Sequence, residues 1–293
     1  PKRKNRRRYS YRNENPPKFN PEELHYDMSG EKFLLIFNHY TYKVTNFFRH
    51  GRPGDRKGTE ADVSGLKSVF SKMGYKVLTY NDFTYEDIMK TIKTCNMQDH
   101  TNTACLCFAI LTHGDKNEYL YAADMPYSLK DITVKLENGH EGLVGKPKLF
   151  FIQACRGDAL DAGRTVQTDG AGSSMSLPST ADFLFLRSSV EELLWFVPGS
   201  TTAARTSAVN QFYCVPVERC YYSYRNVNGS FLIQELCKAL EEHYEDRDIH
   251  YITTMVNRKV AYYYSTYTPN DKKTNNKKQM PEVRHTLTKF FKF

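Results

Sequence analysis

Short apolar segments alternate with segments of helical periodicity along most of the chain. Uninterrupted apolar runs predict buried strands at residues 33–37, 75–80, 104–111, 148–154, 181–186 and 287–291. Apolar residues at helical spacing predict helices at residues 64–74, 129–136, 231–244 and 249–264, and a further helix that begins at Thr84. This alternation predicts an α/β fold, with a mostly parallel sheet of about six strands and helices on both faces.

The length and composition are typical of a globular protein. The 293 residues correspond to one large domain or two modest ones, because a domain commonly holds about 150 residues. Hydrophobic residues make up 40% and charged residues 25%, which is enough apolar material for a sizeable core. The longest apolar run, residues 104–111, is much shorter than the roughly 20 residues of a membrane-spanning helix. We therefore expect no transmembrane helix, and the chain shows no apolar signal-peptide core.

Positive charge is concentrated near the N-terminal end. Residues 1–12 contain seven lysines and arginines and no acidic residue. Without these seven, the net charge of +8 falls to +1, so the remainder of the chain is nearly neutral. The simplest interpretation is that residues 1–28 form a flexible, solvated basic arm; alternatives are binding to nucleic acid or acidic lipid, or nuclear import. Nothing else in the chain is typical of nucleic-acid recognition, so we expect neither a nucleic-acid nor a membrane partner.

The cysteines favour a reducing compartment. There are seven of them, their spacing is irregular, and no C-x-x-C pair occurs. This pattern predicts neither a disulfide framework nor a zinc site, and no metal or organic cofactor is expected. Free thiols without a secretory signal indicate a cytoplasmic protein.

Two reactive side chains follow predicted strands. His113 comes just after the strand at 104–111, and Cys155 directly follows the strand at 148–154. Parallel strands place their carboxyl ends at one sheet edge, where active sites of open α/β sheets lie. A thiol and an imidazole at that edge could act as nucleophile and base. Taken alone, a cysteine that ends a buried strand is usually a core residue, and a histidine before glycine is usually a turn residue.

The segment around the cysteine carries a family resemblance. Gln153-Ala154-Cys155-Arg156-Gly157, with His113 upstream by 42 residues, resembles the signature of the caspases, peptidase family C14. Further matching segments lie at residues 56–62, 181–185, 221–226, 229–231 and 280–281. The resemblance extends from about Tyr26 to Phe293 and implies a caspase-like three-layer sandwich. The short N-terminal arm resembles that of effector caspases.

The resemblance also implies roles for individual residues. Cys155 would be the nucleophile, His113 the acid and base, and the backbone N–H groups of Gly114 and Cys155 the oxyanion hole. A basic pocket would bind the substrate aspartate through Arg56, Gln153 and Arg225, since guanidinium groups bind carboxylates in a bidentate manner. Ser223 and Tyr224 would pair with the extended substrate backbone. Without the resemblance, Arg56 reads as a solvated charge in a basic loop.

Subunit organisation and partners follow from the same resemblance. It implies a large subunit at 29–169 and a small subunit at 170–293, joined by a Gly- and Ser-rich linker at about 157–180 that is cut at Asp169 during activation. Asp158, Asp161 and Asp182 are weaker cleavage candidates, and Asp182 reads as a structural residue. The implied partners are protein substrates with an aspartate at the cleavage site, a second copy that pairs through an edge strand near 287–291, an upstream initiator caspase and inhibitor-of-apoptosis proteins.

One stretch departs from the family pattern. An insertion of about residues 186–212 directly precedes the expected substrate-pairing strand. It is either a surface excursion, or a segment foreign to the native protein, or a change that displaces Arg225. The implied function is a cysteine endopeptidase that cleaves after aspartate and executes apoptosis by limited proteolysis. The alternatives are a catalytically impaired homologue that binds active caspases, and a basic-tailed binding protein on an α/β scaffold.

Overall fold

A computed structural model describes residues 20–49, 51–114, 119–154, 178–188, 228–265 and 279–293, together with the backbone of 225–226. Its centre is a six-stranded sheet in the order β10-β7-β6-β3-β1-β2. The strands are β1 (Glu31–Asn38), β2 (Lys76–Asn81), β3 (Thr103–Leu111), β6 (Lys148–Gln153), β7 (Phe183–Arg187) and β10 (Glu282–His285). All neighbouring pairs are parallel except β7 and β10. The expected mostly parallel sheet is therefore confirmed.

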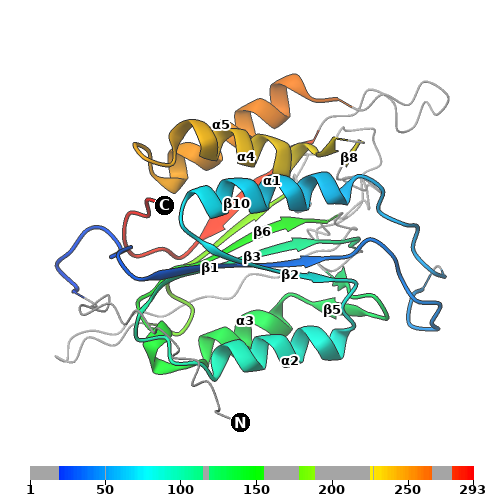
Figure 1. Ribbon diagram of the computed structural model, residues 1–293, viewed down its shortest axis with the longest axis horizontal. Coiled ribbons are helices and arrows are strands. Elements are labelled where there is room, and N and C mark those ends of the chain that lie inside the picture. The colour runs from blue at the N-terminus through cyan, green and yellow to red at the C-terminus, as the bar shows by residue number, and fades with distance from the viewer. Residues whose placement is uncertain are drawn as a thin grey trace, which may run out of the picture.

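Helices cover both faces of this sheet, which makes three layers (Figure 1). One face carries α1 (Thr59–Lys72), α4 (Phe231–His243) and α5 (Ile249–Tyr263), and the other carries α2 (Tyr85–Asn96) and α3 (Lys130–Glu137). Strand β3 supplies both cores because successive side chains point to opposite faces. Its alternate residues Cys107 and Ala109 join the core under α1, whereas Phe108 and Ile110 join the core over α2.

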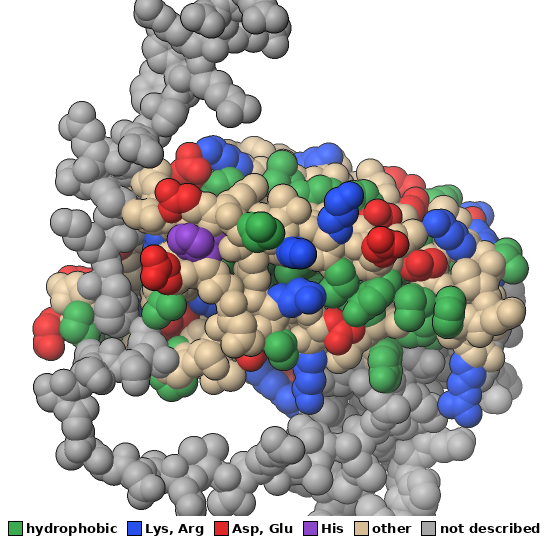
Figure 2. Space-filling model, turned by 90° about the horizontal axis from the view of Figure 1, so that it is seen from below, with side chains coloured by type: hydrophobic (Ala, Val, Ile, Leu, Met, Phe, Trp, Pro, Cys, Tyr) green, Lys and Arg blue, Asp and Glu red, His purple; other side chains and the backbone are tan. Residues whose placement is uncertain are grey.

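The face formed by α2 and α3 is an ordinary solvent-facing surface. Figure 2 shows the face of the molecule seen from below, where positively charged Lys and Arg side chains are interspersed with negatively charged Asp and Glu side chains. Within the described ranges, no helix combines the length and the apolar character needed to cross a bilayer.

The observed starts of two helices can be compared with the starts expected from the sequence. Helix α2 begins after Thr84, whose side chain accepts the N–H of Asp87 in a capping box, as expected from the sequence. Helix α1 begins at Thr59 rather than at residue 64, so the expected start was wrong. Its first turn is polar, yet Thr59 and Asp62 are buried. The Thr59 hydroxyl donates to Asn38 at the end of β1, and Asp62 accepts the backbone N–H of Ser230. A search for apolar periodicity does not detect such a turn.

The expected last strand at 287–291 was also wrong. The edge strand is β10, at Glu282–His285, and its side chains are half-buried or exposed. Phe291 is fully buried in the core outside any strand, and Phe290 forms only an isolated bridge with His25. An edge strand exposes much of its surface and needs no apolar run, whereas the core needs the phenylalanine. The strand at this edge of the sheet is therefore β10, and β2 lies at the other edge.

Asp182 has the structural role that its position suggested. It is buried, has φ 67° and immediately precedes β7. Its Oδ1 accepts hydrogen bonds of 2.6 Å from both the Tyr26 hydroxyl and the Thr288 hydroxyl. Burial, followed by the contact with Asp182, raises the pKa of Tyr26, so its hydroxyl stays protonated and keeps donating. The carboxylate thereby ties the N-terminal segment to the last segment of the chain.

Several expectations lie outside the described residues. These are the basic arm at 1–19, the linker up to residue 177 with Asp158, Asp161 and Asp169, and the insertion beyond Ser188.

Candidate active site

Three neighbouring strands end at one edge of the sheet. Strand β1 ends at Asn38, β3 at Leu111 and β6 at Gln153, and the three lie side by side in parallel register. The arrowheads of these strands point to the end of the molecule where the short strand β8 also lies (Figure 1). The structure therefore brings His113 and Gln153 to the same edge, as expected. Cys155 lies outside the described residues, which reach Ala154 directly before it.

The imidazole of His113 is oriented by a backbone carbonyl. Its Nε2 atom lies 2.9 Å from the carbonyl oxygen of Gly54, in the loop between β1 and α1. Because a carbonyl oxygen can only accept, Nε2 carries a proton, and Nδ1 is the acceptor of the neutral ring. An imidazole in this tautomer can take a proton from a thiol through Nδ1.

The backbone around His113 is held on both sides. Its N–H donates to the Tyr42 hydroxyl at 3.0 Å, and its carbonyl accepts from the N–H of Tyr121 at 3.0 Å. Gly114, the expected oxyanion-hole residue, forms an isolated bridge with Leu120. Tyr121 ends β4 (Tyr119–Tyr121), which pairs with β5 (Pro126–Ser128). This hairpin thus fixes the segment 113–114 against the sheet edge.

Arg56 is fully buried, at 0% exposure, which the charge pattern of its loop did not indicate. Its Nη1 donates to the carbonyl of His39 at 3.0 Å and to the hydroxyl of Thr59 at 2.8 Å. The Thr59 hydroxyl in turn donates to Oδ1 of Asn38 at 2.6 Å. A guanidinium held this way lies at the carboxyl end of β1, where it can present a positive charge to an anionic ligand.

His39 beside Arg56 is neutral. Burial lowers its pKa to about 4, a hydrogen bond to the carbonyl of Phe83 opposes this, and the charge of Arg56 lowers the pKa further. At neutral pH the buried positive charge at this position is therefore that of Arg56, without a contribution from His39.

The end of β6 is fixed by its two neighbouring strands. Gln153 is 1% exposed, and its carbonyl accepts from the N–H of Thr112 at 3.0 Å. On the other side, the Ser188 hydroxyl binds both backbone groups of Ala154, and the N–H of Ser188 donates to the carbonyl of Ile152 at 3.0 Å. Of the two residues before Cys155, Gln153 is thus held from the β3 side and Ala154 from the β7 side.

The expected pocket residue Arg225 belongs to a small hairpin of β8 (Arg225–Asn226) and β9 (Gly229–Ser230). Asp62 of α1 anchors this hairpin, because its Oδ1 accepts the backbone N–H of Ser230 at 2.7 Å. Gly229 has φ 105°, and a Cβ there would clash with the same carboxylate. The side chain of Arg225 is not described, and Ser223, Tyr224 and Asp169 lie outside the described residues.

Sequence reasoning missed four positioning groups: Tyr42, Gly54, Thr112 and Ser188. Each acts through contacts between segments far apart in the chain; the Tyr42–His113 contact, for example, spans 71 positions. The sequence signal available for Thr112 and Ser188 is their position directly after β3 and β7. In the part of the chain that is described, no three His, Cys, Asp or Glu side chains converge as a set of metal ligands.

Comparison with known proteins defines the class. A model described as "Caspase domain" matches residues 31–292, so the chain belongs to the caspase family. It is similar to "Caspase drICE" of Drosophila melanogaster, with 35% identity over 267 residues that cover 88% of this chain and 68% of that protein. It is also similar to "Caspase-7" of Gallus gallus, with 35% identity over 247 residues that cover 80% and 70% of the two chains.

A solved structure confirms the fold. "Crystal Structure of Caspase-1 from Spodoptera frugiperda" superimposes with a TM-score of 0.74 and 29% sequence identity, covering 94% of this chain and 96% of that chain. The resemblance stated from the motifs and the caspase-like three-layer fold are therefore both confirmed.

Proposed function

We propose that this protein is a cysteine endopeptidase that cleaves after aspartate and executes apoptosis by limited proteolysis. The observation that carries the proposal is the placement of His113: its imidazole is oriented by Gly54 at the sheet edge where the segment leading to Cys155 ends. Two relatives named as caspases, from a fly and a bird, support it.

The mechanism follows from these groups. His113 takes the thiol proton of Cys155, and the thiolate attacks the scissile carbonyl carbon. The N–H groups of Gly114 and Cys155 stabilise the oxyanion, whose charge appears only in the tetrahedral state. Collapse breaks the C–N bond, His113 protonates the leaving amine, and a thioester remains. Water, deprotonated by His113, then hydrolyses the thioester and restores the thiol.

Selectivity for aspartate follows from buried charge. Arg56 is fully buried beside a neutral His39, and Gln153 is buried at the adjacent strand end. Together with Arg225, these groups would bind a carboxylate with charge-assisted hydrogen bonds. A neutral side chain could not form these charge-assisted hydrogen bonds and would bind more weakly. Ser223 and Tyr224 would pair with the substrate backbone beside this pocket.

Activation and assembly complete the proposal. A cytoplasmic zymogen would be cut at Asp169 by an upstream initiator caspase, giving a large subunit of 29–169 and a small subunit of 170–293. Two such pairs would form a homodimer through the exposed edge strand β10, where Glu282 and Arg284 alternate with Val283 and His285. Inhibitor-of-apoptosis proteins would be further partners.

The test is hydrolysis of a fluorogenic peptide that ends in aspartate, by the chain before and after cleavage at Asp169. Matched peptides ending in asparagine and glutamate test the pocket, and Cys155→Ala is the control. We expect turnover of the aspartate peptide alone, and none in the control. Turnover that persists in Cys155→Ala, or equal rates for asparagine and aspartate, contradicts the proposal.

A second candidate function is an impaired homologue that binds active caspases. The insertion of about residues 186–212 favours it, because it directly precedes the proposed substrate-pairing strand. This candidate predicts no turnover after cleavage at Asp169, together with binding to an active caspase. Deleting residues 189–212, which lie beyond the contact that Ser188 makes, would restore turnover if the insertion alone blocks the site.

A further inference from the structure

We propose that the hydroxyl of Tyr42 is a positioning group for His113, and that it sets the rate of the chemical step. This inference rests on the proposed function, because it concerns the residue proposed as acid and base. Tyr42 lies in the segment after β1 and is 3% exposed. Its ring contacts the imidazole of His113, with ring centroids 5.3 Å apart.

Four hydrogen bonds form a closed ring around His113, and their directions can be assigned. The N–H of His113 donates to the Tyr42 hydroxyl at 3.0 Å, and the Thr112 hydroxyl donates to the carbonyl of Tyr121 at 2.6 Å. Since a carbonyl cannot donate, the Thr112 hydroxyl uses its only proton in the bond to Tyr121. In the 3.0 Å hydrogen bond between the hydroxyls of Tyr42 and Thr112, Tyr42 is therefore the donor. The N–H of Tyr121 closes the ring on the carbonyl of His113 at 3.0 Å.

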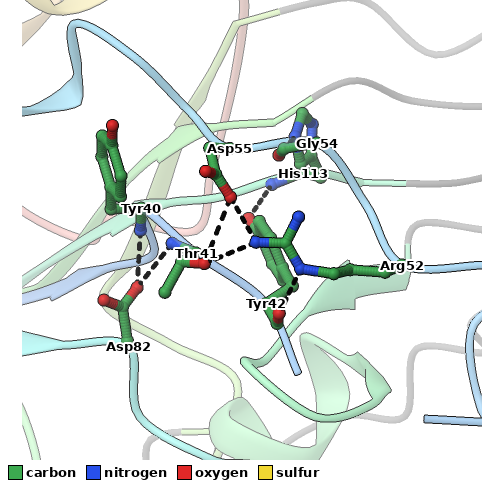
Figure 3. A network of polar contacts seen from close by, with 8 residues as sticks. All are labelled: Tyr40, Thr41, Tyr42, Arg52, Gly54, Asp55, Asp82 and His113. Atoms are coloured by element: carbon green, nitrogen blue, oxygen red, sulfur yellow. Dashed lines mark hydrogen bonds and ion pairs between the residues drawn. The ribbon is translucent and has the colours of Figure 1, made fainter. Parts of the chain in front are cut away.

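Tyr42 is also tied to the loop that orients the imidazole. Its backbone carbonyl accepts from Nε of Arg52 at 2.7 Å, and Nη2 of Arg52 binds Asp55 at 2.5 Å (Figure 3). The ion pair with Arg52 lowers the pKa of Asp55, so the carboxylate is charged at neutral pH. Gly54, whose carbonyl binds the imidazole, lies directly before Asp55.

One residue therefore couples the two constraints on the imidazole. The hydroxyl of Tyr42 holds the backbone of His113, while its carbonyl holds, through Arg52, the loop that supplies the acceptor for Nε2. Proton transfer between thiol and imidazole depends on distance and alignment, so a looser His113 slows the chemical step. The hydrogen-bond partners of this hydroxyl, His113 and Thr112, are not among the residues proposed to bind the substrate carboxylate, so substrate affinity should not change.

Tyr42→Phe removes only this hydroxyl, and Tyr40→Phe is the matched control. No hydrogen bond of the Tyr40 hydroxyl occurs among the described residues, and it points away from the network in Figure 3. For Tyr42→Phe we expect kcat about threefold to tenfold lower, the effect of one hydrogen bond, with an unchanged KM. The thermal midpoint should fall as well, because the N–H of His113 loses its acceptor. Tyr40→Phe should match the wild type. An unchanged kcat, or a loss shared by the control, overturns the proposal.

Two further measurements do not require peptide cleavage. Selective ¹⁵N-histidine labelling gives nine backbone amides, and the His113 amide can be assigned from its absence in His113→Gln. Its hydrogen exchange should be slow in the wild type and in Tyr40→Phe, and faster in Tyr42→Phe. The alkylation rate of Cys155 by iodoacetamide near pH 7 should fall in Tyr42→Phe by a factor similar to that for kcat.

These measurements distinguish failure of the proposed function from failure of the proposed role of Tyr42. If the wild type cleaves no peptide, the proposed function fails, while exchange and alkylation still decide the role of Tyr42. Unchanged exchange and alkylation in Tyr42→Phe overturn the role of Tyr42 even in an active enzyme. If Tyr42→Phe is unstable, Thr112→Val removes the acceptor of the same hydroxyl and should raise the exchange rate of the His113 amide.

Discussion

The hydroxyl of Ser188 binds both backbone groups of Ala154: it donates to the carbonyl at 2.7 Å and accepts from the N–H at 3.2 Å. Both residues are buried, and Ser188 directly follows β7. One side chain thus satisfies two backbone groups at the point where β6 has ended and no ladder partner continues. Cys155 directly follows Ala154, so this pair of bonds fixes the backbone immediately before the proposed nucleophile.

Replacing Ser188 by alanine leaves two buried backbone groups of Ala154 without this partner. We expect Ser188→Ala to lower the free energy of unfolding by about 1–3 kcal/mol and to reduce kcat more than it raises KM. Urea denaturation and peptide kinetics measure the two effects. Ser71→Ala on the exposed face of α1 is the control and should stay within about 0.5 kcal/mol of the wild type. Equal stability of the two variants would contradict this prediction.

Arg56→Lys tests the pocket while keeping the charge. Lysine cannot reproduce the two bonds from Nη1 to His39 and Thr59 while also presenting a planar fork to a carboxylate. We expect kcat/KM for the aspartate peptide to fall by roughly 100-fold or more. The exposed neighbouring residue supplies the control, Lys57→Ala, which should retain wild-type kcat/KM. A loss of less than about threefold in Arg56→Lys would exclude Arg56 from the pocket.

Gly229→Ala tests the link between α1 and the hairpin that carries Arg225. Gly229 has φ 105°, and a Cβ there would lie 2.4 Å from Oδ1 of Asp62, whereas Gly74 has φ 80° and a Cβ there would meet no atom within 4 Å. Alanine at either position is strained, but only at 229 does the new methyl group meet another residue. Gly229→Ala should therefore lose about 1–3 kcal/mol more than Gly74→Ala in urea denaturation, and kcat/KM should fall only in Gly229→Ala. Equal losses in the two variants would show that the Asp62 contact contributes nothing.

Acid should destabilise the protein through His39. Its pKa is about 4 in the fold, below the usual value of 6.5, so the unfolded chain binds this proton first as pH falls. The contribution of neutral His39 is thus fully present above pH 6.5 and is lost progressively down to about pH 4, by roughly 2–3 kcal/mol. His39→Gln, which can keep a donor toward Phe83, should unfold with a shallower pH slope over this window.

The control for this prediction is a second buried histidine. Burial also lowers the pKa of His100, which therefore adds to the total slope in the same direction. His100→Gln should remove its own share and leave that of His39, and the double variant should remove both. Thermal midpoints between pH 4 and pH 8 provide the comparison, and identical slopes in His39→Gln and the wild type would refute the assignment.

Local signals explain the parts of the fold that were predicted correctly. Strand β3 is a continuous apolar run because it is buried on both faces, and helix α2 begins at a capping box encoded within four residues. The expected strand at 287–291 was wrong for a related reason. Phe291 is buried in the core, although its backbone pairs with no strand, whereas the actual edge strand, β10, is largely polar.

For the candidate site, the sequence by itself determined the reactive residue types, their positions after two strands, and the family motif around Cys155. It also determined the alternation of strands and helices that predicts a mostly parallel sheet. The tertiary structure alone decided that Arg56 is buried, that Gly54 orients the imidazole of His113, and that Ser188 and Tyr42 hold the neighbouring backbone. The reason is physical: chain order and periodicity are local properties, whereas burial and hydrogen-bond partnership arise between segments that meet only when the sheet has formed.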